Sequence, residues 1–449
     1  MVSKTRILDT YDAIRSTYWF FPLIISIIAV ILAIVVSHFD QTIPADLIQR
    51  LFFVFHINLN NVHSTLITLA TAQIGVIGVV FSITLVPLTI STSSYGSVIL
   101  RVFLRDLSTQ IVLGAYSASI AYDLATIIIL SNGSFLNVIP VLSVTTGFIF
   151  FIFDLALLIY FFQHVASLLQ AANIIALLGI SLDKSIRSNI LPGSPSDSGK
   201  TEPIKHAENG PSEQQVILSR KTGYIRLVDY ETLMDIAKKK DQVLHVHCYA
   251  GNFVNAGDPM LRASPGRLDD RTVKLLQRSF YIGNFRTMRQ DPKFGISILV
   301  NIAARALSPA VNESIIPVMV LNRLGVALSL IAEKGDRVGD RVDDMGHPRI
   351  IVQTDAFKDL VDNSFNLIRQ YGRGNADLFI AMLNTISKIA PHIRTEHQRM
   401  VLLHYASLVK GEISNGVPAD YDRQRIEEVY ENTVHTLNGS LPVQRTPDA

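Results

Sequence analysis

Residues 18–39 read YWFFPLIISIIAVILAIVVSHF, and this stretch decides the class of fold. It contains no Asp, Glu, Lys or Arg, and as a helix it is long enough to cross a hydrocarbon layer of about 30 Å. It opens with Tyr18, Trp19, Phe20 and Phe21, and such aromatic residues are typical of the membrane interface. Because no cleavage site of small residues follows, we interpret it as a retained transmembrane helix and not as a signal peptide.

The composition of the chain indicates a membrane protein with a substantial polar part. Of its 449 residues, 49% are hydrophobic and only 17% are charged, whereas roughly 25% of the residues of a soluble globular protein are charged. The net charge of +2 gives no reason to expect nucleic acid as a partner. Cys248 is the only cysteine, which excludes an intramolecular disulfide and a zinc site built on paired cysteines. The sequence predicts no metal site and no cofactor.

The long apolar runs predict an α-helical membrane bundle of four transmembrane helices within residues 18–182. Basic residues concentrate before the first span, between the second and third, and after the fourth, while the other two connections hold only Arg50. The positive-inside rule therefore predicts a multi-pass membrane protein, with its N-terminal segment (residues 1–17) and its C-terminus in the cytoplasm. The lipid bilayer is its first expected partner. The predicted spans are residues 18–39, 62–90, 107–130 and 138–162.

The rest of the chain predicts a cytoplasmic α+β region. Residues 183–215 are rich in Pro, Gly, Ser and charge, and indicate a flexible linker. A small β module (216–265), a helical domain (266–412) and a polar C-terminal helix and tail (413–449) follow. The apolar run at 313–333 has the length of a fifth span, but Arg323 near its centre favours a buried soluble helix. The expected helices are residues 230–240, 270–280, 294–307, 313–333, 355–371, 376–390 and 395–408.

The β module resembles the small lipoyl/biotinyl-like β barrel of carrier proteins and membrane-fusion adaptors. The resemblance rests on Gly223-Tyr224-Ile225, on residues 243–248 (VLHVHC), and on Gly251 and Gly257, which permit tight turns between short strands. No Lys occupies the hairpin tip where a carrier would be modified. We therefore expect a structural module without swinging-arm chemistry.

The second predicted span carries small and weakly polar residues on one helix face, which we call the small-residue stripe. Its members recur every third or fourth residue, which is the spacing of a single face of an α-helix. One interpretation is tight packing against another span. The other is a pore, in which several copies of this helix surround an axis and an apolar ring gates by dewetting. The stripe consists of Ser64, Thr68, Thr71, Gly75, Gly78 and Ser82, continued by Leu85 or Val86 and by Thr89.

Two acidic residues lie within predicted spans, Asp123 in the third and Asp154 in the fourth. A carboxylate within a membrane is costly and usually faces a partner or water. Hydrogen bonding within the bundle and a proton or cation relay are both open interpretations. The two residues lie at different depths along their spans, so a direct pair is not expected.

Short motifs along the chain point to a known family. They are YWF at 18–20, GVVFSITL at 78–85, VILRVFLRD at 98–106, IYFFQHV at 159–165, SRKTGYI at 219–225, GNFRTMRQDPKFG at 283–295 and RALSPAVN at 305–312. With these motifs the chain resembles, over most of its length, a family of predicted bacterial membrane proteins known as domain of unknown function 2254. The resemblance implies the membrane topology and a cytoplasmic domain, but no settled activity.

The last two of these motifs give the best candidate site outside the membrane. Their polar residues flank one predicted helix, 294–307. They could tie helix ends together through Asp291 and Arg305, or they could form a pocket for an anion or nucleotide, because the guanidinium fork of Arg suits phosphate. His245 and His247 share one strand face, but no third zinc ligand is near. The candidate residues are Arg286, Thr287, Gln290, Asp291, Arg305 and Asn312.

Three classes of function remain open. We expect a homo-oligomeric ion channel or pore with a cytoplasmic gating domain, with other copies of the chain and ions as its partners. By layout alone, a four-span bundle whose Gly-rich helix is kinked at Pro87 and leads into a β module is similar to the small-conductance mechanosensitive channels. The alternatives are a proton-coupled transporter that uses Asp123 and Asp154, and a non-conducting membrane-anchored sensor or scaffold. No combination of nucleophile, base and oxyanion donors can be assembled, so an enzyme is not expected.

Overall fold

The computed structural model describes residues 19–42, 62–95, 106–131, 140–168, 170–189, 214–334, 341–352, 356–417 and 419–439. The chain divides into two compact units, residues 1–173 and 174–449. The predicted N-terminal segment (1–17) and the end of the predicted tail (440–449) lie outside the described residues.

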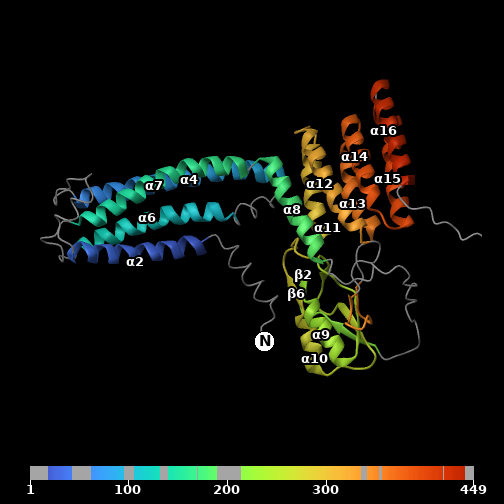
Figure 1. Ribbon diagram of the computed structural model, residues 1–449, viewed down its shortest axis with the longest axis horizontal. Helices are drawn as coiled ribbons and strands as arrows, with labels where there is room; N and C mark the ends of the chain where they lie inside the picture. The colour runs from blue at the N-terminus through green and yellow to red at the C-terminus, as the bar shows by residue number, and fades with distance from the viewer. Residues whose placement is uncertain are drawn as a thin grey trace, which may run out of the picture. The chain divides into compact units, whose positions relative to one another are not determined.

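The first unit contains four long apolar helices that lie side by side (Figure 1). Each is long and apolar enough to cross a membrane, and each coincides closely with one predicted span. The apolar runs therefore place the four helices correctly, with ends that differ by a few residues. The helices are α2 (Phe20–Thr42), α4 (Val62–Tyr95), α6 (Leu107–Ser131) and α7 (Val141–Leu168).

Small side chains bring these helices close together, as is typical of helix packing in lipid. Ala29 and Ala33 of α2 are buried in one cluster with Ala118 and Tyr122 of α6. Gly114 of α6 lies so close to α2 that an added Cβ would be 2.7 Å from Ile25 Cδ1. The backbones of α2 and α6 can approach because glycine and alanine line their contact.

The helix α8 (Ala171–Asn189) leads into the second unit. It extends into residues 183–189, where a flexible linker was predicted, because Leu182 and Ile186 are buried apolar residues of the same helical pattern. An added Cβ on Gly295 would lie 2.9 Å from Leu182 Cδ1, so α8 packs on the helix that carries Gly295. The rest of the predicted linker, residues 190–213, lies outside the described residues.

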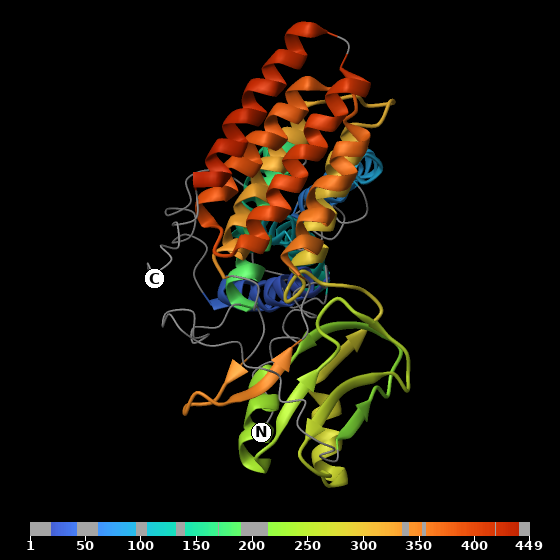
Figure 2. The same cartoon turned by 90° about the vertical axis from the view of Figure 1, so that its right-hand side faces the viewer.

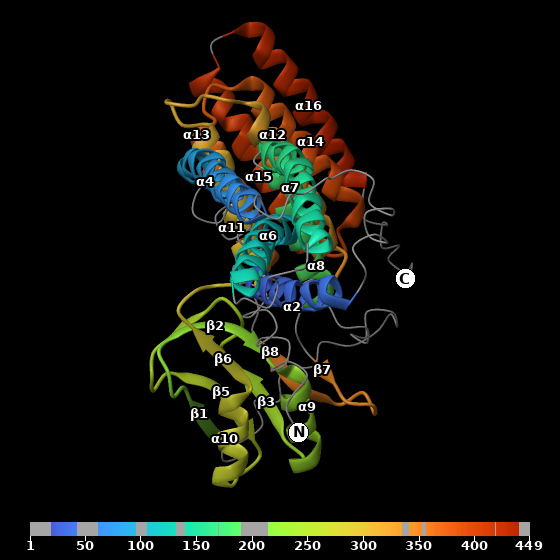
Figure 3. The same ribbon diagram turned by 90° about the vertical axis from the view of Figure 1, so that its left-hand side faces the viewer.

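The β module of the second unit consists of two open sheets, and the predicted lipoyl-like barrel is wrong (Figure 3). The five-stranded sheet has the order β1-β5-β3-β8-β7, in which β3 and β8 are parallel and the other pairs are antiparallel. The three-stranded sheet has the order β4-β2-β6. The strands are β1 (Gln215–Leu218), β2 (Gly223–Val228), β3 (Val243–Val246), β4 (Phe253–Val254), β5 (Pro259–Ser264), β6 (Phe280–Gly283), β7 (Arg341–Val342) and β8 (Pro348–Val352).

The module is also less contiguous than the predicted range 216–265. Strands β6, β7 and β8 join it from beyond residue 265, because Phe280 and Ile350 are buried in the same apolar core as Leu244 and Leu261. Two helices interrupt the strands: α9 (Tyr230–Lys240), which coincides with the predicted helix, and α10 (Asp270–Arg278). Asp229 and Asp269 begin these helices by accepting hydrogen bonds from backbone N–H groups of the first turn.

The helical part of the second unit is a bundle whose helices run alongside one another (Figure 2). Among them α12 is a fifth helix long and apolar enough to span a membrane, and 56% of its apolar window is buried inside the protein. An added Cβ on Gly325 of α12 would lie 2.9 Å from Thr385 of α14, so these two helices pack closely. The bundle consists of α11 (Pro292–Ala306), α12 (Ile315–Ala332), α13 (Phe357–Tyr371), α14 (Ala376–Ile389), the short 3-10 helix η2 (Ala390–His392), α15 (Glu396–Gly416) and α16 (Asp420–Gly439).

Candidate functional site

The small-residue stripe of α4 faces away from the other helices of its own chain. Every described member of the stripe is exposed, and nothing lies within 4 Å of a Cβ added to Gly75 or Gly78. The buried residues of α4, among them Leu66, Gln73 and Val80, lie on the opposite helix face. In the described part of one chain, the stripe therefore does not pack against another span, and packing against a span of another copy stays a prediction. The side chain of Val86 lies outside the described residues.

Four hydroxyl groups of the stripe donate hydrogen bonds within their own helix. Thr68, Thr71 and Thr89 each donate to the backbone carbonyl four residues earlier at 2.7 Å. Ser82 donates in the same way to Gly78 O at 3.1 Å. Since these donors are satisfied, the stripe can face lipid, water or another protein surface without leaving an orphaned hydrogen-bond donor.

The exposed faces of the neighbouring helices differ from the stripe in composition. On α2 the exposed face carries large apolar side chains such as Ile28 and Ile31, and on α7 it carries Ile152, Phe153 and Ile159. These side chains are typical of a surface that contacts lipid. The exposed face of α4 also carries large apolar side chains, among them Ile67, Ile74 and Phe81, but Ser, Thr and Gly form a line along it that α2 and α7 lack. The stripe is thus a distinct surface of the first unit.

The two acidic residues of the spans are buried inside the first unit. Asp123 is 0% exposed and Asp154 is 2% exposed. None of their four carboxylate oxygens has a hydrogen-bond partner among the described residues. Gln73 of α4, which is 1% exposed, lies beside Asp123, and both polar atoms of its side chain also have no hydrogen-bond partner among the described residues. Three buried polar side chains, one from each of three helices, thus make no hydrogen bond with another described residue.

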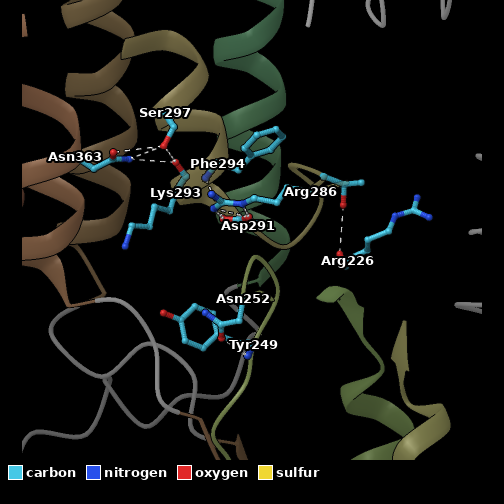
Figure 4. A network of polar contacts seen from close by, with 10 residues as sticks. Arg226, Tyr249, Asn252, Arg286, Asp291, Lys293, Phe294, Ser297 and Asn363 are labelled. Atoms are coloured by element: carbon cyan, nitrogen blue, oxygen red, sulfur yellow. Dashed lines mark hydrogen bonds and ion pairs between the residues drawn. The ribbon is translucent and has the colours of Figure 1, made fainter. Parts of the chain in front are cut away.

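The polar residues of the motif at 283–295 form one hydrogen-bonded network at the start of α11 (Figure 4). Arg286 donates to both oxygens of Asp291, from Nε at 2.8 Å and from Nη2 at 3.0 Å. Asp291 also accepts from Phe294 N at 2.9 Å, so it caps the helix, and the guanidinium lies 5.0 Å from the centre of the Phe294 ring. Gly251 reaches this carboxylate so closely that an added Cβ would collide with Asp291 Oδ2.

Two further residues of this motif join α11 to the β module. The side-chain amide of Gln290 pairs with the backbone of Val228 in the way that a neighbouring strand would. Its Oε1 accepts from Val228 N at 2.8 Å, and its Nε2 donates to Val228 O at 3.1 Å. Thr287 donates to Arg226 O at 3.3 Å. Both contacts are made with the backbone of β2. The network therefore positions the β module against the start of α11.

Arg305 and Asn312 lie at the other end of α11. The helix has 15 residues, so its two ends are about 20 Å apart. Arg305 is exposed in the last turn, and Asn312 adopts a left-handed φ of 46° in the following turn. The structure therefore does not bring these two residues together with Arg286, and the partner of Asp291 is Arg286 and not Arg305.

Sequence reasoning missed two polar contacts that connect the membrane helices. Asp40 at the end of α2 accepts three hydrogen bonds from Leu142 and Ser143 at the start of α7. Asp106 at the start of α6 contacts His164 Nε2 at 2.8 Å near the end of α7. No periodic signal marks either pair, because each joins residues more than fifty positions apart.

The histidine and cysteine residues of the β module belong to no larger cluster of metal-ligating side chains among the described residues. No group of three or more His, Cys, Asp or Glu side chains among the described residues could hold a metal ion. Burial and the nearby Arg262 lower the pKa of His247, while burial and Asp258 raise the pKa of the Cys248 thiol. Both shifts favour neutral side chains at neutral pH, so Cys248 is a weak nucleophile.

The comparisons with known proteins agree with this architecture. Two uncharacterized proteins, one of Mycobacterium bovis and one of Mycobacterium tuberculosis, are each 26% identical to the chain over 353 residues. The aligned region covers 77% of this chain and 66% of each relative, so the chain spans slightly less than two thirds of the length of these relatives. No solved structure matches the chain significantly. Residues 15–388 match a family described as a predicted membrane protein, and the chain therefore belongs to the family of domain of unknown function 2254.

Proposed function

We propose that the protein is a homo-oligomeric ion channel or pore of the bacterial plasma membrane. In this proposal α4 of each copy turns the small-residue stripe toward a shared axis. Both termini lie in the cytoplasm, and the residues that follow α8 form the gating domain. The observation that carries the proposal is the exposure of every described member of the stripe in a single chain, on the α4 face opposite the residues that pack in its own bundle.

The physical argument compares this face with the rest of the bundle surface. A face that contacts only lipid is stabilised by large apolar side chains, as on α2 and α7. Small residues allow several helices to approach a common axis, and hydroxyl groups tolerate water along it. Leu85, 58% exposed on the same face, would supply an apolar ring that closes the path by dewetting.

Cysteine accessibility tests this proposal directly. Replacing Cys248, the only cysteine, by Ser gives a background without thiols. Cysteine is then introduced at Thr71 or Ser82 on the stripe, and at Ile28 or Ile159 as matched controls on the exposed faces of α2 and α7. A membrane-impermeant thiol reagent should react with the stripe cysteines and change the single-channel current several-fold. The control cysteines should stay unmodified in the bilayer.

The mass of the assembled protein tests whether it is a homo-oligomer, as the pore requires. The detergent-solubilised protein should have the mass of several chains, and Gly78→Val should reduce the current per assembled oligomer because its side chain narrows the axis. A monomeric mass, or stripe cysteines as unreactive as the controls, would overturn the pore. A melting temperature raised by a specific metabolite, in protein that carries no current, would support the sensor or scaffold instead.

A further inference from the structure

The core of each four-helix unit contains a second polar feature, distinct from the stripe. Gln73 of α4, Asp123 of α6 and Asp154 of α7 are each at most 2% exposed. Six of their side-chain N and O atoms have no hydrogen-bond partner in the part of the chain that the structure describes. Since Gln73 lies on the buried face of α4, opposite the stripe, this feature belongs to the interior of one subunit.

No basic side chain of the bundle can compensate these acids. The sequences of α2, α4, α6 and α7 contain no Lys or Arg. An isolated ionised carboxylate in a low-dielectric interior costs many kcal/mol, so the acids need a proton, a cation or water. Buried acids of this kind that lie within membrane helices commonly form proton relays.

The spacing of the two acids fits a relay and not a single shared site. Asp123 lies against Gly147 of α7, where an added Cβ would be 2.5 Å from Asp123 Oδ1. Asp154 follows Gly147 on the same face of α7 by two helical turns, which is about 10 Å along the axis. Ser119, which precedes Asp123 by one turn on the same helix, lies beside Asp154. A proton would therefore move between the acids through Ser119 and water.

We propose that Gln73, Asp123 and Asp154 form a proton-conducting path inside each subunit. The path goes beyond the proposed pore, because it requires neither a second copy of the chain nor the small-residue stripe. Asp154 and Asp123 bind the proton in turn, and the amide of Gln73 supplies a donor and an acceptor beside Asp123. The transferred species is a proton, so no covalent bond other than O–H is broken or formed.

The other titratable side chains that the structure describes in the four helices are either bonded or exposed. Tyr116 donates to Asp154 O, and Tyr122 donates to Ser143 O. Asp40 is held by the start of α7, and His164 by Asp106. His38, His63 and Tyr160 are exposed. Among the described titratable groups of these helices, Asp123 and Asp154 are therefore the two left for a proton to use.

Proton flux into liposomes tests the path. The full-length protein is reconstituted with a pH-sensitive dye inside, and a membrane potential is imposed with potassium and valinomycin. Asp123→Asn and Asp154→Asn should each reduce the proton flux at least tenfold with unchanged oligomeric mass. Gly147→Ala keeps both acids but pushes a methyl group onto Asp123, so it should also reduce the flux. Asp344→Asn, which removes a 93% exposed carboxylate, should leave the flux unchanged.

Chemical labelling of the wild-type protein tests the path without any variant that could fail to fold. A hydrophobic carbodiimide adds to a protonated carboxyl group to give an N-acylurea, without loss of atoms. In the wild-type protein it should label Asp123 or Asp154, as found by mass spectrometry, and should block the flux in proportion to labelling. Absent wild-type flux, unchanged flux in both Asn variants, or flux that follows a Na⁺ gradient and ignores the proton gradient would overturn the path.

The assay also separates this path from the proposed pore. Thiol modification of a stripe cysteine acts on the interface between copies, whereas Asp123→Asn acts within one subunit. Flux that is lost in Asp123→Asn but is insensitive to stripe modification supports the path alone. Flux that depends only on stripe modification overturns the path and leaves the pore.

Discussion

Asp40, at the end of α2, caps the helix α7 by accepting hydrogen bonds from Ser143, which lies about one hundred residues later in the chain. Its Oδ2 accepts hydrogen bonds from Ser143 N at 2.9 Å and from Ser143 Oγ at 2.6 Å, and its Oδ1 accepts from Leu142 N at 2.9 Å. The first N–H groups of a helix have no partner within the helix, and a carboxylate there also interacts favourably with the helix dipole. The end of α2 is thereby fixed to the start of α7.

Replacing Asp40 by Ala should therefore destabilise the membrane bundle by about 1–3 kcal/mol, because it leaves buried donors unpaired. Asp40→Asn keeps an acceptor and should cost less. Equilibrium unfolding of the protein in mixed micelles measures the free energy of unfolding. Gln41→Ala, which changes the exposed polar neighbour, serves as the control. Equal stability of Asp40→Ala and Gln41→Ala would show that the cap contributes nothing.

The contrast between Asp40 and the spans shows what sequence patterns could predict. The four spans follow from uninterrupted apolar runs, because a lipid-embedded helix must be apolar over its whole length. No pattern in the sequence marks the role of Asp40, since periodicity within one helix carries no information on which residue of another helix it meets. The stripe was visible as a pattern, but whether it faces its own bundle depends on helix rotation, which only the packed structure gives.

Arg286 and Asp291 give a second prediction, this time for the second unit. The guanidinium binds both carboxylate oxygens at once, and Lys cannot reproduce this fork. Arg286→Lys should therefore lower the free energy of unfolding by about 1 kcal/mol. Arg305→Lys, at the exposed opposite end of α11, should change it by less than about 0.5 kcal/mol. Amide hydrogen exchange in the first turn of α11 should increase in Arg286→Lys alone, and equal exchange in both variants would contradict the assigned role.

The turn between β7 and β8 predicts a pH dependence. The hydrogen bond from Arg349 Nε to Asp343, at 2.8 Å, and the backbone N–H groups of His347 and Met345 lower the pKa of Asp343 from 3.8 to about 2. A lowered folded-state pKa means that the ionised carboxylate stabilises the fold fully above the unfolded pKa. This contribution is lost as the pH falls from about 4 through 2.

Melting temperatures measured from pH 6 to pH 2 test this dependence. Wild type should melt higher than Asp343→Asn at pH 5 to 6, and the difference should shrink as the pH falls below about 4. Asp344→Asn removes the adjacent, 93% exposed carboxylate, which pairs with Lys238 at the surface, and should have little effect at any pH. A difference between wild type and Asp343→Asn that stays constant down to pH 2 would refute the linkage.

The β module shows where sequence patterns fail. Helix α9 is predicted at its observed position, because its apolar spacing is local. The closed barrel was wrong because β8 pairs with β3 in parallel from about a hundred residues away, and a local window cannot detect such a partner. In the candidate cluster, Asp291 contacts Gly251 and Arg286. The sequence could not distinguish these contacts from a contact with Arg305, because Gly251, Arg286 and Arg305 all lie near turns.

A comparison of Gly251 with Gly257 measures the energetic cost of placing a side chain against Asp291. Both have a positive φ, 102° and 96°, so alanine at either position should cost on the order of 1–2 kcal/mol in backbone strain. Only at Gly251 would the added Cβ also collide with the Asp291 carboxylate, whereas nothing lies within 4 Å of a Cβ at Gly257. Gly251→Ala should therefore destabilise the protein more than Gly257→Ala. In an Asp291→Ala background the two substitutions should cost the same, because the colliding carboxylate is gone. An excess cost at Gly251 that persists without Asp291 would mean that another contact, and not the carboxylate, requires glycine there.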